Sequence, residues 1–130
     1  MSKDWVNDIY EMHKKYGVHT AVDKMDKDTL AKYLEFRVNF LQEELNELKF
    51  ADNADDIVDA LVDLCVVAIG TLDAFEVNAN LAWDRVHEAN MAKVVGVKES
   101  RPNPLGLPDL IKPEGWTAPS HKDNTGLIVV

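Results

Sequence analysis

Acidic side chains crowd one segment of the sequence, residues 43–63, and could do chemistry together. Eight acids and one base, Lys49, stand there, so the local charge is −7 in a chain whose net charge is −9. The acids are Glu43, Glu44, Glu47, Asp52, Asp55, Asp56, Asp59 and Asp63. They stand among Leu, Ile, Val and Ala, which is unusual for a solvated surface, and hard divalent cations prefer oxygen ligands. The segment therefore predicts a cage for a divalent cation.

Helical spacing brings the glutamates to one side of an expected helix over residues 27–50. Neighbours on a helix face lie three or four residues apart, and a stripe with this spacing runs along the segment. Its members are Leu30, Leu34, Arg37, Leu41, Leu45 and Leu48. At 3.6 residues per turn, Glu44 falls inside the stripe, Glu47 lies at its flank, and Glu43 points further round.

The aspartates fall on a second expected helix, over residues 54–75. Asp56, Asp59 and Asp63 share one arc of this helix, which is otherwise apolar nearly all round and is expected to be buried. Buried carboxylates need cations or hydrogen-bond donors, because an unpaired buried charge is very costly. A short polar loop makes the two helices antiparallel neighbours, so the aspartates should face the glutamates.

Helix capping offers a simpler explanation for part of this pattern. Asp55 and Asp56 suit a helix N-terminus, where the dipole favours acids, and Asn53 suits the capping position. The same dipole disfavours acids near the end of the first helix, so capping leaves its glutamates unexplained. It also leaves Asp63, in the middle of a helix, unexplained, whereas Asp52 is interpreted as a loop residue.

The chain as a whole is expected to be all-α, a four-helix body followed by an irregular arm. The expected helices cover residues 4–16, 27–50, 54–75 and about 78–95, with no strand. Residues 96–130 hold all five prolines and form the arm. We interpret residues 1–95 and the arm as parts of one domain, because the arm is too short and too poor in periodic apolar residues to fold alone.

Composition excludes several function classes. A sequence pI near 4.8 argues against binding to a nucleic acid polymer, which needs a basic face. The longest apolar run is too short for a bilayer, and no signal-peptide core is seen at the start. The single cysteine, Cys65, excludes an internal disulfide framework, so a cytoplasmic setting is expected. One cysteine and scattered histidines also make zinc an unexpected ligand.

The expected fourth helix carries groups that suit a phosphate held by metal. Asn90 shares a face with Trp83 and His87, and Lys93 flanks it. Amide and ammonium groups can donate to phosphate oxygens that the cation leaves free. Solvated surface positions are the alternative for both residues. Trp83 and His13 are candidate base contacts, with a core or interface role as the alternative.

Taken in order, these residues resemble the MazG-like all-α nucleoside triphosphate pyrophosphohydrolases. Glu43-Glu44-x-x-Glu47 followed by Asp56-x-x-Asp59 is similar to the EExxE…ExxD signature of that family, with Asp56 in place of the usual Glu. The resemblance extends over nearly the whole chain. Its other segments are Met12-His13-x-x-Tyr16-Gly17, Arg37-x-x-x-Leu41, Val86-His87-x-x-Asn90-Met91-x-Lys93 and Lys112-Pro113-x-Gly115-Trp116.

The resemblance implies hydrolysis of a (deoxy)nucleoside triphosphate to the monophosphate and pyrophosphate, by water attack on the α-phosphorus. It implies two or more Mg²⁺ or Mn²⁺ ions per site, and a homodimer or homotetramer. The implied metal ligands are Glu44, Glu47, Asp56 and Asp59, with Asp63 as a supporting or further ligand. Glu43 or Glu44 would activate the water. Asn90 and Lys93 would hold phosphate oxygens, and Arg37 would either join them or pair with the acids.

Two other function classes stay open at this point. One is a metal-dependent nucleotide-binding or regulatory protein with little turnover. Pyrophosphate release in Mg²⁺ separates it from a hydrolase. The other is an acidic helical interaction module, in which the carboxylates form a partner surface. Thermal stabilisation by metal separates it from both nucleotide-dependent classes, because a ligand that binds only the folded state raises stability.

Overall fold

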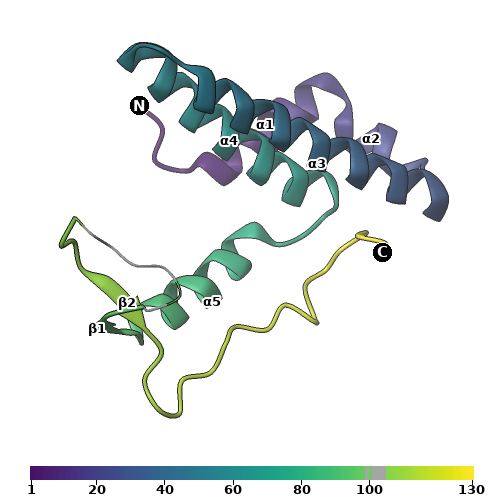
Figure 1. Ribbon diagram of the computed structural model, residues 1–130. Coiled ribbons are helices and arrows are strands. Elements are labelled where there is room, and N and C mark those ends of the chain that lie inside the picture. The colour runs from purple at the N-terminus through teal and green to yellow at the C-terminus, as the bar shows by residue number, and fades with distance from the viewer. Residues whose placement is uncertain (99, 101–104) are drawn as a thin grey trace. The chain divides into compact units, whose positions relative to one another are not determined.

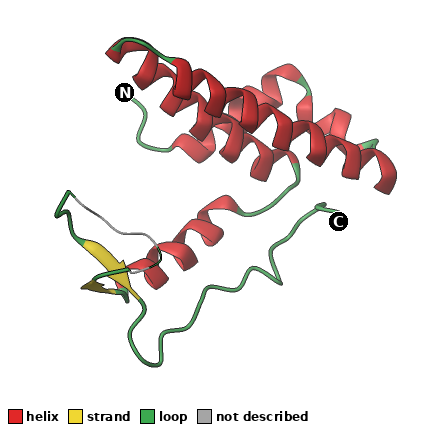
Figure 2. Ribbon diagram, in the orientation of Figure 1, coloured by secondary structure: helices red, strands yellow, loops and turns green. Residues whose placement is uncertain are grey.

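The structure is a computed structural model that describes residues 1–98, 100 and 105–130. Helices dominate it, as Figure 2 shows, so the all-α expectation is confirmed. The helices are α1 (Trp5–Tyr16), α2 (Val18–Asp23), α3 (Lys27–Phe50), α4 (Ala54–Ala74) and α5 (Ala79–Met91). The strands are β1 (Val94–Gly96) and β2 (Asp109–Ile111). Among the described helices, none is both long enough and apolar enough to span a membrane.

The chain forms two compact units. The first, here called the helical unit, comprises Met1–Ala79 together with Asn124–Val130. In it α3 and α4 pack against each other, and α4 also contacts α1 and α2 (Figure 1). The second unit comprises Asn80–Asp123 and contains α5 and the two strands.

Local signals set the ends of the long helices. The Asp26 carboxylate accepts from the backbone N–H of Thr29 at 2.8 Å and caps α3. The Asn53 side chain accepts from the N–H of Asp56 at 2.8 Å and caps α4, as expected. Such caps satisfy N–H groups that have no partner within the helix. Between the two helices, residues 51–53 form the short turn that makes α3 and α4 neighbours.

The apolar core of the helical unit lies where α2, α3 and the end of α4 meet. Its buried members are Val22, Leu30, Ala74, Phe75 and Val77. The last residues of the chain dock on this cluster: Leu127, Ile128 and Val129 pack against it, and the N–H of Leu127 donates to the Phe75 carbonyl at 2.7 Å.

Two asparagines join the points where the chain leaves the helical unit and returns to it. The backbone N–H of Asn78 donates to the Asn124 side chain at 2.9 Å, and that side chain donates back to the Asn78 carbonyl at 2.8 Å. We call this reciprocal pair the asparagine clasp.

The second unit is held by polar contacts between α5 and the later chain. The Trp116 indole N–H donates to the Ala89 carbonyl at 2.8 Å. The Arg85 guanidinium donates to both carboxylate oxygens of Asp123, at 2.6 and 2.8 Å. This guanidinium lowers the pKa of Asp123 to about 2.

Three expectations are wrong in detail. The fourth helix ends at Met91 rather than Val95, because the β-branched pair Val94 and Val95 enters an antiparallel ladder with β2, in which Val94 faces Ile111. Strands therefore form at the end of the expected body and within the arm, which was expected to be irregular. Helix α2 was not expected, since it has only six residues and begins after Gly17 without a side-chain cap.

The burial of α4 is also incomplete within one chain. Only one side of α4 is covered by its neighbours, so several apolar residues of its first half stay exposed. Val58 is 62% exposed and Leu61 is 48% exposed.

Candidate functional site

Helices α3 and α4 bring three of the predicted carboxylates to one point. One oxygen each from Glu44, Glu47 and Asp63 can be chosen so that all lie within 4.8 Å of one another. Glu44 and Glu47 share a face of α3, one turn apart, and Asp63 faces them from α4. We call these three residues the acidic cluster.

Glu44 is the buried member of the cluster, at 9% exposure. Within the described part of the chain, its Oε2 is buried and has no hydrogen-bond partner. Burial raises the pKa of Glu44, and the charges of Glu47, Asp63 and Glu43 raise it further. A buried carboxylate oxygen without a donor is costly, so this position fits a cation ligand.

Asp59 extends the cluster along α4. Burial raises the pKa of Asp63, and the neighbouring charges of Asp59 and Glu47 add to this effect. Four carboxylates thus repel one another around a small volume. Repulsion of this kind is relieved either by protons or by a divalent cation.

A pocket of about 290 Å³ opens beside the cluster. Glu47, Asp56 and Asp59 line it with Phe50, Ala51 and Ala60. One oxygen of Asp56 accepts from the Asn53 side chain at 2.8 Å, so Asp56 also takes part in capping α4. The two explanations for Asp56, capping and metal binding, are therefore compatible in this geometry.

Without metal, the charge of Glu44 should destabilise the fold at neutral pH but not at mildly acidic pH, where the carboxyl is protonated. The difference in stability between wild type and a variant without this charge should therefore depend on pH. A carboxyl whose pKa is raised by folding stabilises the fold below its unfolded pKa, and this contribution is lost as pH rises through the folded pKa. Glu44→Gln should therefore melt above wild type at pH 7 in EDTA, and the difference should vanish near pH ~4, where carboxyls ordinarily titrate. Thermal melts across pH measure this difference.

The matched control is Glu35→Gln, on the same helix, where the side chain is exposed. Its melting temperature should follow that of wild type without a similar pH-dependent difference. An equal effect of both substitutions would show that general surface charge, and not the cluster, governs the response.

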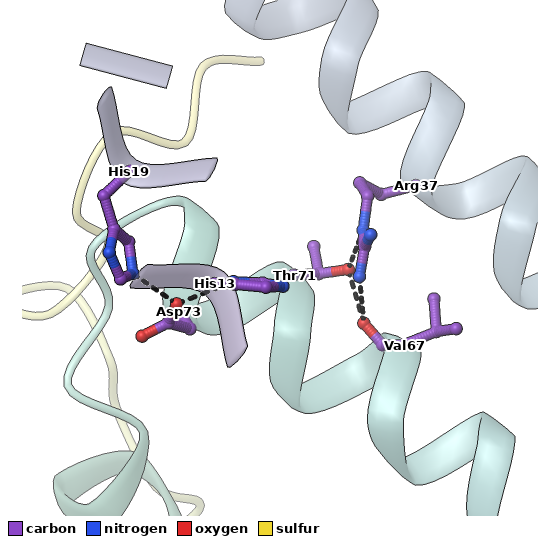
Figure 3. Close-up of polar contacts among 6 residues, drawn as sticks. All are labelled: His13, His19, Arg37, Val67, Thr71 and Asp73. Carbon is purple, nitrogen blue, oxygen red and sulfur yellow. Dashed lines mark hydrogen bonds and ion pairs between the residues drawn. The ribbon is translucent and has the colours of Figure 1, made fainter. Parts of the chain in front are cut away.

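Arg37 lies two turns before Glu44 on α3 and is also buried, at 9% exposure. Its Nε donates to the Thr71 hydroxyl at 2.9 Å, and its guanidinium donates to the Val67 carbonyl at 2.9 Å, as Figure 3 shows. A side chain on Gly70 would force the guanidinium to shift, since a Cβ there would lie 2.8 Å from it. These contacts place Arg37 in the interface between α3 and α4.

His13, a candidate base contact, is 6% exposed. Its Nδ1 lies 2.7 Å from the Asp73 carboxylate, and His19 Nε2 lies 2.7 Å from the same oxygen (Figure 3). Sequence reasoning missed His19 and Asp73. The only signal was the type of residue, because Asp73 is 60 positions from His13 along the chain.

The remaining candidates lie in the second unit. Asn90 is exposed and belongs to α5, and Trp83 is 71% exposed. Lys93 follows the end of α5, and its Nζ lies 5.4 Å from the centre of the Trp116 ring. Lys112 Nζ lies 5.0 Å from the same ring. Lys93 and Lys112 therefore share a contact with the Trp116 ring, which the sequence analysis did not predict.

Comparison with known protein families gives the class of the chain. Residues 18–90 match the family model described as phosphoribosyl-ATP pyrophosphohydrolase, which belongs to the MazG-like all-α pyrophosphohydrolases. The match covers more than half of the chain and includes the acidic cluster and the carboxylates that line the adjoining pocket. The chain therefore belongs to the phosphoribosyl-ATP pyrophosphohydrolase family. The family points to hydrolysis of a phosphoric anhydride in a nucleotide.

Comparison with curated proteins found no match, and comparison with solved structures found none either.

Proposed function

We propose that this protein hydrolyses a (deoxy)nucleoside triphosphate to the monophosphate and pyrophosphate in the presence of Mg²⁺ or Mn²⁺. The observation that carries the proposal is the buried, unpartnered Oε2 of Glu44 within the acidic cluster. Family membership supplies the reaction class. The all-oxygen donor set suits these hard cations, which prefer carboxylate ligands.

The carboxylates of both helices have separate roles in this proposal. Glu44, Glu47, Asp56, Asp59 and Asp63 would hold two or more ions. When bound, these ions neutralise the triphosphate and lower the pKa of water. Glu43 is exposed beside Glu44, and one of these two residues would orient the attacking water and accept its proton.

Lys93 and Asn90 would donate to phosphate oxygens. Both carry donors, and an ammonium adds a charge that complements phosphate. We assign Arg37 a structural role in the interface between α3 and α4 and not a role in substrate binding, because its guanidinium is buried and already donates to Thr71 and Val67.

A substrate panel tests the function. Canonical and modified NTPs and dNTPs, and phosphoribosyl-ATP, would each be incubated with Mg²⁺ or Mn²⁺ and scored for pyrophosphate release. Release from at least one nucleotide is expected. Metal-dependent nucleotide binding without release would favour a regulatory protein. No response to metal or nucleotide, in activity or thermal stability, would favour an acidic interaction module.

The protein should also be a homodimer or homotetramer. The first half of α4 leaves apolar side chains exposed that a second copy could cover, namely Ile57, Val58, Leu61 and Val62. Light scattering at micromolar concentration should give at least twice the chain mass of 14.6 kDa. Leu61→Glu should shift the mass toward that of one chain, since a charge would then enter the interface. A wild-type mass of 14.6 kDa would contradict the proposal.

A further inference from the structure

A second group of side chains that could bind a metal ion lies away from the acidic cluster, at the far end of α4. His13 from α1 and His19 from α2 both point at Asp73 of α4, as Figure 3 shows. Both ring nitrogens lie 2.7 Å from Asp73 Oδ2. One atom from each of the three side chains can be chosen so that all lie within 4.8 Å of one another.

We propose that His13, His19 and Asp73 form a binding site for a borderline transition-metal ion of the zinc class. Two imidazole nitrogens and one carboxylate oxygen are a donor set that Zn²⁺ and Co²⁺ accept, whereas Mg²⁺ prefers oxygen alone. The site is therefore chemically distinct from the all-oxygen acidic cluster. A fourth position would be left for water.

The local charge favours a cation here. The neighbouring carboxyl of Asp23 raises the pKa of Glu76, and His19 acts on that pKa in the opposite direction. The carboxyl groups of Asp73 and Glu76 thus both lie near His19. A divalent ion would offset this excess of negative charge, as bound ions commonly do.

The ligands are already held close to binding positions. His13 is buried, and the His19 ring lies against the Tyr10 ring with centroids 4.9 Å apart. Metal–ligand bonds of about 2.0–2.2 Å in a tetrahedral site require the nitrogen and oxygen atoms to separate by roughly 0.7 Å more than hydrogen-bond distance. The short helix α2 carries His19, whose side chain is 25% exposed, so a shift of this size involves few contacts.

Binding needs no redox partner and no covalent step. In the structure, each imidazole nitrogen that faces Asp73 lies at hydrogen-bond distance from the carboxylate, so this nitrogen carries the proton and donates it. Binding of the ion would move that proton to the other ring nitrogen or to solvent, which frees the lone pair for the ion. The bound ion would link α1, α2 and α4 next to the core residues Val22 and Phe75. It would therefore act as a structural clamp on the helical unit, and would stabilise the fold by binding only the folded state.

The test uses the full chain with Mg²⁺ in excess, so that the acidic cluster is occupied by its own ion. Co²⁺ should bind at one ion per chain with a visible absorption band, and Zn²⁺ should displace it. Zn²⁺ should also raise the melting temperature. His19→Gln should weaken Zn²⁺ binding by more than about 100-fold, since even residues that only support ligands cost about 10–100-fold.

Matched variants locate the site. His87→Gln removes an exposed histidine elsewhere, and Glu44→Gln removes a carboxylate of the acidic cluster, so both should bind Zn²⁺ as wild type does. Asp73→Asn should lose binding as His19→Gln does, with circular dichroism confirming that each variant is folded. Absence of the cobalt band, or undiminished Zn²⁺ binding in His19→Gln, would show that the three residues form only a hydrogen-bonded anchor.

Discussion

Glu44→Gln is expected to abolish pyrophosphate release while leaving the fold intact. The substitution keeps the shape of the side chain and removes its charge, at a buried carboxylate whose Oε2 has no hydrogen-bond partner among the described residues. A residue that merely supports a metal ligand is worth about 10–100-fold in activity or affinity, so loss of a ligand should cost more than about 100-fold. Initial rates at saturating Mg²⁺ measure the loss.

Asp59→Asn should lose activity to a similar extent, because Asp59 lines the pocket beside the cluster and would hold the same ions. Two exposed positions serve as controls: Glu35→Gln on α3 and Asp55→Asn on α4 should keep wild-type rates. Unchanged turnover in both Glu44→Gln and Asp59→Asn would refute the proposed metal site.

Lys93→Ala should reduce kcat/KM for every accepted nucleotide by a similar factor. The ammonium would contact phosphate, which all substrates share, so the order of base preference should not change. A donor lost from the transition state is worth about 3–4 kcal/mol by analogy with an oxyanion donor, which corresponds to roughly 100- to 1000-fold in rate. Steady-state kinetics on at least one purine and one pyrimidine nucleotide measure the effect.

Lys112→Ala provides the matched control for this experiment. Lys112 and Lys93 both place Nζ near the Trp116 ring, at 5.0 and 5.4 Å, so either substitution removes one cation from the indole. Only Lys93→Ala should impair catalysis if the phosphate contact is what matters. Equal losses in both variants, or a switch of base preference in Lys93→Ala, would contradict the phosphate assignment.

The features predicted from sequence are those that short-range spacing controls. The bounds of α3 and α4 follow from their caps at Asp26 and Asn53 and from an apolar repeat between them. The approach of Glu44, Glu47 and Asp63 follows as well, because the glutamates are one turn apart and a three-residue turn makes α3 and α4 neighbours, whereas Asp56 and Asp59, which were expected as ligands, line the adjoining pocket.

The features that sequence analysis missed depend on contacts between distant segments. The strands that pair Val94 with Ile111 are separated by a long segment rich in Pro and Gly and not by a two-residue hairpin turn, so the sequence does not mark their pairing, and its formation shortens α5. His13 and His19 meet Asp73 only after α1, α2 and α4 pack, so no motif spacing marks the group. A histidine in such a sequence looks isolated until the fold supplies its partners.

The asparagine clasp makes the second unit a topological insertion in the helical unit. Asn78 and Asn124 hold the two ends of the intervening chain together, and the last residues then return to the core at Phe75. The entropy of closing such a loop grows only slowly, by about 0.6 kcal/mol for each doubling of length. Insertions or deletions between the two asparagines should therefore cost the helical unit little, and relatives could vary in length there while both ends of the core are retained.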